Sequence, residues 1–420
     1  MDRIVVEGGA RLEGQVAASG SKNATLALMT AALLADGETV LRNVPRVRDV
    51  DVMLDLLAAL GAPARWDDEE PAVVRILGGR VSRPEAPYDL VRRMRASFMV
   101  LGPLVARYGC GRVSEPGGCA IGVRPVDQHL RGLEALGAKV ARDGGYVEMS
   151  ARRLRGARFR FDVTTVNGTQ NVMMAATLAE GETVLENAAL EPEVVELARV
   201  LRAMGADIEG EGTSTLRIRG VEGLRPVDHT ASGDRIEAGT LLVAGAITGG
   251  EVEVTGVEPR RLGATLDRLR ETGAELRVGP DRVAIRAPER PRGIRVVTAP
   301  FPGFATDMQA QIMALLCVAE GASVVTETVF ENRFMHVPEL RRMGAEIALA
   351  GRSAHVRGVP RLSGAPVMAT DLRASASLIL AGLAAEGETR VNRVYHIDRG
   401  YERIEAKLAG LGARIRRESG

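Results

Sequence analysis

A Gly-Ala dipeptide at the end of a helix-like segment recurs six times along the 420 residues of this chain. Each copy closes a segment whose apolar residues follow the period of an α-helix, and a short run typical of a β-strand comes next. Glycine directly after the last apolar turn indicates a helix C-terminus, because glycine adopts a left-handed conformation without strain. The glycines are Gly61, Gly137, Gly205, Gly273, Gly344 and Gly412, separated by steps of 76, 68, 68, 71 and 68 residues.

A second pattern lies between these copies. An Ala- and Leu-rich segment closes on a glycine and an alternating strand follows, clearly at residues 33–41, 178–185 and 383–391 and more weakly near Gly109, Gly249 and Gly321. Each repeat therefore holds two helices, each followed by strand. A period of roughly seventy residues exceeds the 20–50 usual in solenoids. We therefore expect compact α/β domains, three repeats in each of two lobes, with a ligand cleft between the lobes.

The most apolar helical segments are expected to be enclosed. Residues 24–35 and 172–179 are apolar on all sides, which is typical of a helix inside a core. The alternating strands should cover these helices on one face.

Composition argues against several kinds of partner. Lys+Arg of 55 against Asp+Glu of 54 gives a net charge of +1, and aromatic residues make up only 3% of the chain. Neither a basic field nor base-stacking platforms are present, so we expect no nucleic acid partner. The N-terminus lacks an apolar run long enough for a signal peptide, and residues 24–35 are too few to span a membrane. Three cysteines leave at least one free thiol, which fits a cytoplasmic protein.

The segment at residues 116–125 combines a thiol with glycines, prolines and an arginine. Pro116, Gly117 and Gly118 precede Cys119, and Gly122 and Arg124 follow it. Proline and glycine predict a loop, a nearby cation favours the thiolate, and glycine-rich backbone leaves amide donors for an anion. This segment therefore predicts chemistry on a charged small molecule.

Seven motifs give the whole chain a family resemblance. They lie at residues 19–24, 94–97, 116–127, 306–311, 330–339, 369–377 and 396–403. With these motifs the chain resembles the UDP-N-acetylglucosamine 1-carboxyvinyltransferase family, the enolpyruvyl transferases of peptidoglycan synthesis.

The resemblance implies a two-lobed, inside-out α/β barrel with interior helices and outward-facing sheets. Six α/β units are shared equally between the lobes. The first lobe is expected at residues 22–232 and carries the Cys119 loop. The second comprises residues 1–21 and 233–420 and carries Asp307, Arg333, Arg373 and Arg399.

The implied reaction joins phosphoenolpyruvate to the 3′-hydroxyl of UDP-N-acetylglucosamine and releases phosphate by addition and elimination. No cofactor or metal is expected, and the five histidines show no ligand spacing. The resemblance assigns Lys22, Arg124 and Arg399 to the substrate phosphate, and Arg333 and Arg373 to its carboxylate. Arginine suits both anions because its planar fork donates hydrogen bonds in pairs. Since these cations come from both lobes, the substrate is expected to draw the lobes together.

Cys119 matches the family's general acid, which protonates the methylene carbon, while Lys22 and Arg399 assist catalysis. Asp307 matches the residue that contacts the sugar hydroxyl and is the candidate general base. Because residues 305–309 also read as a helix N-terminus, an N-cap is the alternative role for Asp307. Asp371 and Leu372 are expected to shape the same pocket, and Asn23 to hold polar groups of the substrate beside Lys22.

A larger set matches positions that bind the sugar nucleotide. These residues are Asn23, Arg95, Arg124, Pro125, Val126, Asp127, Gln128, Val163, Thr164, Thr165, Val166, Asp307 and Val329. Some family members carry a lysine in the run at 163–169 that this chain lacks. Backbone amides and threonine hydroxyls are the candidates to replace it.

The remaining cysteines, Cys110 and Cys317, are expected to be small buried residues, with Cys317 in an apolar helix. Two other functions stay open. The related shikimate-pathway enolpyruvyl transferase shares the fold, but Ser21-Lys22-Asn23 and Cys119 argue against it. The altered 163–169 run favours a non-catalytic sugar-nucleotide-binding paralogue, but Cys119, Asp307 and the arginines argue against that alternative.

Overall fold

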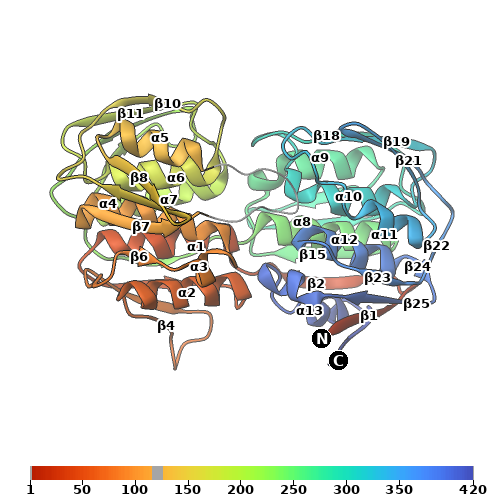
Figure 1. Ribbon diagram of the computed structural model, residues 1–420. Coiled ribbons are helices and arrows are strands. Elements are labelled where there is room, and N and C mark those ends of the chain that lie inside the picture. Colours follow the sequence, from red (N-terminus) through yellow and green to blue (C-terminus); the bar gives the residue numbers. More distant parts are fainter. Residues whose placement is uncertain (1, 116–125, 420) are drawn as a thin grey trace. The chain divides into compact units, whose positions relative to one another are not determined.

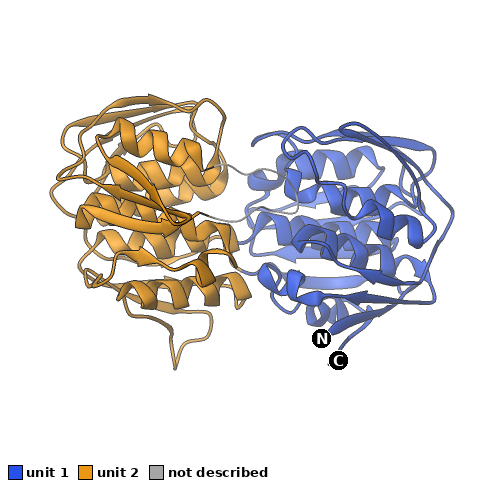
Figure 2. Ribbon diagram, in the orientation of Figure 1, with its two compact units in different colours: residues 1–19, 119–123, 233–420 blue, residues 20–118, 124–232 orange. Residues whose placement is uncertain are grey.

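The computed structural model of the chain describes residues 2–115 and 126–419. These residues divide into two compact units, drawn in two colours in Figure 2. Unit 1 contains residues 2–19 and 233–419, and unit 2 contains residues 20–115 and 126–232. The chain therefore passes from one unit to the other after Ser19 and again after Ser232.

Each unit contains three copies of one α/β arrangement. A linking strand pairs in parallel with the strand that follows an inner helix, and an outer helix and a hairpin complete the copy. The remaining pairs in each sheet are antiparallel, as in the sheet of strands 10 to 13. Six four-stranded sheets result among the described residues. The sixfold α/β repeat that the glycines predict is thus confirmed.

Unit 2 is built from the following elements (Figure 1). They are α1 (Lys22–Ala31), η1 (Ala32–Leu34), β3 (Gly37–Arg42), α2 (Arg48–Leu60), β4 (Ala64–Trp66), β5 (Val74–Gly78), β6 (Glu85–Ala86), α3 (Tyr88–Val91), η2 (Arg95–Val100), α4 (Leu101–Tyr108), β7 (Cys110–Ser114), α5 (Asp127–Ala135), β8 (Lys139–Asp143), β9 (Tyr146–Ser150), β10 (Arg158–Arg160), α6 (Val166–Ala176), β11 (Glu182–Glu186), α7 (Pro192–Met204), β12 (Asp207–Glu209), β13 (Thr215–Arg219) and β14 (Asp228–Thr230). Its sheets have the orders β14-β3-β5-β4, β6-β7-β9-β8 and β10-β11-β13-β12.

Unit 1 repeats the pattern with elements from two parts of the chain. They are β1 (Arg3–Glu7), β2 (Glu13–Ala17), α8 (Arg235–Ile247), β15 (Glu251–Thr255), η3 (Pro259–Leu262), α9 (Gly263–Glu271), β16 (Glu275–Val278), β17 (Arg282–Arg286), β18 (Arg295–Val297), η4 (Thr306–Met308), α10 (Gln309–Leu316), β19 (Ala322–Thr326), α11 (Val337–Arg342), β20 (Glu346–Ala350), β21 (Ser353–Arg357), β22 (Leu362–Ser363), β23 (Pro366–Met368), α12 (Leu372–Leu383), β24 (Ala385–Glu386), β25 (Glu388–Asn392), η5 (Val394–Arg399), α13 (Ile404–Gly410) and β26 (Arg414–Glu418). Its four-stranded sheets have the orders β16-β17-β15-β2, β18-β19-β21-β20 and β23-β25-β1-β26, and β22 pairs with β24.

Strands β1 and β2 complete two sheets of unit 1 although they precede unit 2 in the sequence. β1 lies between β25 and β26 and is antiparallel to both. It takes the sheet position that the second hairpin strand holds in the other repeats. β2 pairs in parallel with β15, as a linking strand does.

The six Gly-Ala glycines end their helices as predicted. All six have φ between 89° and 113°, the left-handed conformation that favours glycine. The glycines that precede the strands after the inner helices, such as Gly37, Gly181 and Gly387, also have positive φ. The chain therefore changes direction at glycine twice in each repeat.

The inner helices form the two cores. They are α1, α4 and α6 in unit 2, and α8, α10 and α12 in unit 1, and the sheets of each unit lie outside them (Figure 1). Every residue of α8 after Arg235 is buried. Residues 24–35 are all buried, and residues 172–179 are buried except for half-buried Leu178, which confirms the prediction of enclosed helices. In the described part of the chain, no helix is long and apolar enough to cross a membrane.

Candidate active site

Asp307 lies between two arginine side chains within unit 1. Arg333 donates from Nη2 to one carboxylate oxygen at 2.9 Å, and Arg373 donates to the other from Nε at 3.1 Å and from Nη2 at 2.7 Å. The guanidinium groups are buried, with Arg333 6% and Arg373 3% exposed. The Asp307 side chain is 29% exposed, so solvent reaches the carboxylate but hardly reaches the arginines. Charged hydrogen bonds of this kind are about twice as strong as neutral ones.

Three adjoining elements of unit 1 bring these residues together (Figure 1). Asp307 belongs to η4, directly before α10, and Arg333 lies in the loop between β19 and α11. Arg373 is the second residue of α12, which packs against α10. Asp307 was expected as either a base or an N-cap. The structure contradicts the N-cap role, because neither η4 nor α10 has a side-chain cap and both arginines bind the carboxylate instead.

Asp371 positions Arg373 by capping α12. Its Oδ1 accepts hydrogen bonds from the backbone N–H groups of Arg373 at 2.8 Å and of Ala374 at 3.1 Å. The Arg373 guanidinium lies 5.4 Å from the centre of the Tyr401 ring. Burial alone would lower the pKa of Arg373, but the Asp307 carboxylate together with Tyr401 and Asp234 outweighs it, and the pKa is raised. Arg373 is thus a permanently charged, rigidly held donor.

Leu372, the residue before Arg373, packs against the backbone directly after Arg399. Arg399 is half-buried at the end of η5, two residues before Tyr401. Leu372 packs so closely on Gly400 that an added Cβ there would lie 2.7 Å from its Cδ2 atom. Leu372 therefore fixes the backbone that carries Arg399. Val329, in the loop after β19, is half-buried, and its N–H donates to Glu327 Oε1 at 2.7 Å.

Lys22 and Asn23 begin α1 in unit 2. Ser21 caps this helix by accepting from the backbone N–H of Ala24. The Lys22 ammonium lies 3.2 Å from the carboxylate of Asp49, and both side chains are buried. A buried ammonium requires such a partner, because the loss of water disfavours its charge. Asn23 is half-buried beside Lys22.

A polar group surrounds the first turn of α5. Gln128 donates to Asp127 at 2.8 Å, and its Oε1 accepts from the backbone N–H of Asp162 at 2.9 Å. Asp127 Oδ1 is buried and has no hydrogen-bond partner among residues 2–115 and 126–419. The side chain of Gln128 thus links the first turn of α5 to the backbone of Asp162. Arg95 and Val126, both half-buried, begin η2 and precede α5 respectively.

His129 is a buried imidazole that the sequence patterns missed. Its Nδ1 lies 3.0 Å from the Asn171 amide nitrogen, and its ring meets Phe98 edge to face at 5.3 Å. Burial, with a smaller contribution from the charge of Arg95, lowers the pKa of His129 to about 3. His129 is therefore neutral at physiological pH. Only its place in the same helical turn as Asp127 could have singled it out among five dispersed histidines.

The altered run at 163–169 comprises the three residues before α6 and the first turn of that helix. Val163 is 59% exposed, and the Thr164 hydroxyl donates to Asn187 Oδ1 at 3.0 Å. Thr165 is the N-cap, and its hydroxyl accepts from the backbone N–H of Gly168. Both hydroxyls proposed to replace the missing lysine thus already stabilise this loop. The backbone N–H groups of the first turn of α6 remain the other candidate.

The cysteines differ from one another. Cys119 lies outside the described residues, as do Arg124 and Pro125. Cys317 is fully buried as expected, and burial raises the pKa of its thiol to about 12. The expectation that Cys110 is buried is wrong, because it is the exposed first residue of β7, directly after the glycine that turns the chain.

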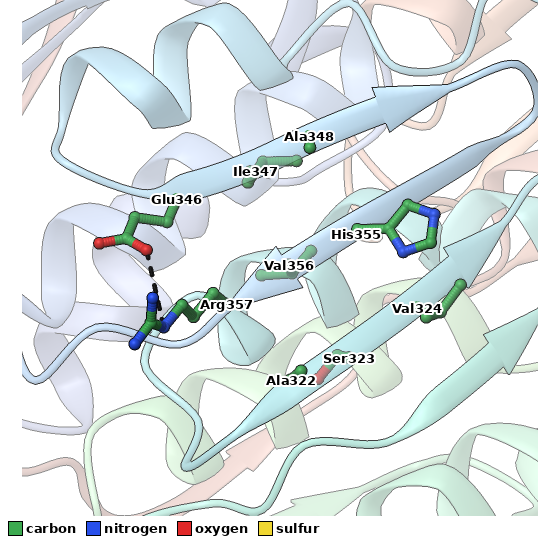
Figure 3. A pocket seen from close by; sticks show the side chains of 9 residues that line it. All are labelled: Ala322, Ser323, Val324, Glu346, Ile347, Ala348, His355, Val356 and Arg357. Atoms are coloured by element: carbon green, nitrogen blue, oxygen red, sulfur yellow. Dashed lines mark ion pairs between the residues drawn. The ribbon is translucent and has the colours of Figure 1, made fainter.

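Metal ligands and cavities are the other features, besides the cluster of Asp307, Arg333 and Arg373, that can form a functional site. No group of three or more His, Cys, Asp or Glu residues within 2–115 and 126–419 gathers as metal ligands would. A hollow of about 440 Å³ opens over β19, β20 and β21, where His355 lies between Val324 and Ala348 (Figure 3). The nine residues that line it include none of the predicted site residues.

The sequence did not predict several residues that contact the predicted site residues. Asp49 pairs with Lys22, Tyr401 underlies Arg373, and Glu327 accepts from Val329. Each is remote in sequence from its partner or lacks a recognisable spacing. For Glu327 the one available signal was a charged residue directly after an alternating strand, at a position that proves to be buried.

The whole chain is similar to known enolpyruvyl transferases in sequence. The model of a family described as EPSP synthase (3-phosphoshikimate 1-carboxyvinyltransferase) matches residues 6–408. A Myxococcus xanthus protein named UDP-N-acetylglucosamine 1-carboxyvinyltransferase is 59% identical over 419 residues and covers 100% of both chains. A protein of the same name from Anaeromyxobacter sp. is also 59% identical, over 420 residues and 100% of both chains.

Solved structures agree on the fold. The enolpyruvyl transferase NikO from Streptomyces tendae matches with a TM-score of 0.89 and 30% identity, covering 100% of this chain and 99% of that one. An EPSP synthase from Acinetobacter baumannii matches with a TM-score of 0.78 over 100% of both chains, and at 19% identity it shows the fold alone. With the enclosed helices and outer sheets, these neighbours confirm the inside-out α/β barrel.

Proposed function

Because the chain belongs to the carboxyvinyl (enolpyruvyl) transferase family that the EPSP synthase model describes, we propose that it transfers the enolpyruvyl group of phosphoenolpyruvate to the 3′-hydroxyl of UDP-N-acetylglucosamine. The observation that carries the choice of acceptor is 59% identity, over the full length, to two proteins of that name. The reaction is the first committed step of peptidoglycan synthesis. Unpaired thiols at Cys110 and Cys317 are compatible with a cytoplasmic location.

The arginine cluster in unit 1 supports a role for Asp307 as the base. Asp307 takes the proton of the sugar hydroxyl while that oxygen bonds to the central carbon of phosphoenolpyruvate. Cys119 gives a proton to the methylene carbon, and a tetrahedral ketal results. Loss of a proton from the new methyl group then expels phosphate, with Lys22, Arg124 and Arg399 balancing its charge.

The two arginines on Asp307 are the ones proposed to hold the substrate carboxylate. Arg333 and Arg373 present three donors to the Asp307 carboxylate. A substrate carboxylate needs the same donors, so its binding displaces Asp307 toward the sugar hydroxyl. A carboxylate that faces fewer guanidinium groups is the stronger base. Binding of one substrate therefore prepares the group that acts on the other.

Phosphate release from phosphoenolpyruvate, measured with different acceptors, tests the proposed function. We expect stoichiometric release with UDP-N-acetylglucosamine and none above background with shikimate 3-phosphate. Release with shikimate 3-phosphate alone would assign the chain to the shikimate-pathway reaction. No release with either acceptor, together with tight binding of UDP-N-acetylglucosamine, would favour the non-catalytic paralogue.

A further inference from the structure

Four hydrogen bonds converge on the carboxylate of Glu327, the residue directly after β19. Oε1 accepts from the Thr298 hydroxyl at 2.7 Å and from the backbone N–H groups of Val329 at 2.7 Å and Phe330 at 3.2 Å. Oε2 accepts from the Thr306 hydroxyl at 2.8 Å. The residue is 1% exposed. A carboxylate suits this place because its two oxygens offer about four acceptor sites.

These bonds tie together three segments that are distant in sequence. Thr298 directly follows the linking strand β18, and Thr306 is the residue before Asp307. Val329 opens the loop that leads to Arg333. Thr298 strengthens the junction, because its hydroxyl accepts from the backbone N–H of Thr328 at 2.9 Å and its carbonyl accepts from the Thr328 hydroxyl at 2.5 Å. The segment that carries Asp307 and the loop that carries Arg333 thus both form hydrogen bonds with the side chain of Glu327.

Comparison with the other repeats shows what is particular about Glu327. The residues six positions after the corresponding glycines in two repeats of unit 2 are Asn43 and Asn187. Each donates from Nδ2 to the carbonyl of the residue that follows the linking strand of its repeat, Ala231 at 2.8 Å and Phe161 at 2.9 Å. Glu327 makes the same link through Thr298, and its second oxygen and longer side chain reach Thr306 as well.

We propose that Glu327 is a positioning residue, which holds Asp307 through Thr306 and holds the Val329–Arg333 loop through its backbone amides. The inference rests on the proposed function, which makes Asp307 the base. Removal of the carboxylate leaves two backbone N–H groups and two hydroxyls without their acceptor, and the two loops are then no longer joined. A displacement of the base by about 1 Å is enough to lower turnover on the order of a hundredfold.

Variants of the network test this role. We expect Glu327→Ala to lower kcat at least tenfold, and Thr306→Val to lower it less. Glu327→Gln should recover most of the activity, because its amide oxygen accepts from the backbone N–H groups and its NH₂ donates to Thr306. The matched control is Thr326→Val, at the residue before Glu327, which removes a hydrogen bond to Ser353. It should leave kcat unchanged.

Two readouts separate positioning from loss of folded protein. The KM for phosphoenolpyruvate should rise as kcat falls, because the loop that carries Arg333 is no longer held in place. The pKa values in the pH profile of kcat should shift, because Asp307 no longer faces the guanidinium groups in the same way. A smaller concentration of folded protein would lower kcat and leave the KM and these pKa values unchanged. A kcat for Glu327→Ala within twofold of the control, or a full loss explained by a smaller concentration of folded sites, would overturn the inference. If Glu327→Ala does not fold, Thr306→Val decides the matter alone, because unchanged turnover in that variant contradicts the link to Asp307.

A double-variant cycle distinguishes failure of this inference from failure of the proposed function. If Glu327 acts through Asp307, Glu327→Ala should reduce the residual turnover of Asp307→Asn by no more than twofold. Independent, multiplying effects would refute the positioning role. Normal turnover in Asp307→Asn alone would instead refute the assignment of Asp307 as the base.

Discussion

Replacement of Asp307 by asparagine removes the charge that balances two buried guanidinium groups. Breaking a buried ion pair from one side costs about 3–5 kcal/mol, because it leaves the partner charge uncompensated in a poorly solvated place. The Asp307 side chain is 29% exposed, and asparagine still offers one acceptor oxygen. The lower end applies, so we expect unfolding of unit 1 to become easier by about 3 kcal/mol. For a unit of this size that corresponds to a melting temperature lower by about 6–12 °C.

The same substitution should strengthen the binding of phosphoenolpyruvate while it lowers turnover severely. Unit charges 4 Å apart attract by about 4 kcal/mol at an effective dielectric constant of 20, and the substrate carboxylate no longer competes with Asp307 for that attraction. Water that solvates the freed donors offsets part of this gain. We expect the dissociation constant to fall about tenfold, which corresponds to 1.4 kcal/mol.

Scanning calorimetry and isothermal titration check both parts of this prediction. Phosphoenolpyruvate should raise the melting temperature of Asp307→Asn more than that of the unaltered protein. The control is Asp228→Asn, which breaks an exposed pair with Arg42 on an outer sheet of unit 2. It should change stability by less than about 1 kcal/mol and leave substrate affinity unchanged. Weaker binding of phosphoenolpyruvate to Asp307→Asn would refute the competition between the two carboxylates.

Three further substitutions give separate tests. Cys119→Ser should greatly reduce turnover and preserve UDP-N-acetylglucosamine binding. Fosfomycin, a phosphonate epoxide that alkylates the family cysteine, should label Cys119 alone. Mass spectrometry that finds Cys110 labelled instead would redirect the assignment. Burial lowers the pKa of His129 to about 3 and of His336 to about 4, so below pH 6.5 the unfolded chain binds protons that the folded protein does not. Urea unfolding should therefore show a loss of about 1.4 kcal/mol per pH unit and per histidine as the pH falls from 6.5 to 5, and an unchanged slope in His336→Asn would contradict this cause. Gly400→Ala places a Cβ against Leu372 and should destabilise the folded protein by about 1–2 kcal/mol and lower kcat. The control Gly410→Ala has open space around its Cβ and should leave the melting temperature unchanged. Equal melting temperatures of the two variants would contradict the packing argument.

The repeat architecture could be predicted because its signal is local. A helix that ends before a strand needs a residue with positive φ at its C-terminus, and glycine supplies it at a fixed place in each repeat. Gly61 and Gly412 lie at opposite ends of the sequence and still have φ values of 89° and 99°. The enclosed helices followed in the same way from runs without a polar face.

The partners within the site could not be predicted, because they depend on contacts between remote segments. Residues 305–309 do begin a helical turn, but Asp307 is the second residue of η4 rather than its N-cap, and arginines 26 and 66 residues away bind its carboxylate. Residues 109–111 gave no indication that Cys110 faces solvent, since exposure of a strand residue depends on which face the sheet turns outward. Glu327 carried no recognisable motif, because its partners are hydroxyls and backbone amides rather than charges.

Insertion of β1 between β25 and β26 sets the order in which the protein can mature on the ribosome. Unit 2 is built from residues 20–115 and 126–232, which are made before residues 233–419 of unit 1, so it can close while the remainder is still being translated. β1 is made before unit 2, yet both of its neighbours are made after unit 2, and Ile4, Val5 and Val6 are fully buried only once β25 and β26 are in place. Until β26 is made, these three apolar side chains need a chaperone or another temporary cover. A stalled or truncated product that lacks β26 is therefore expected to aggregate through β1.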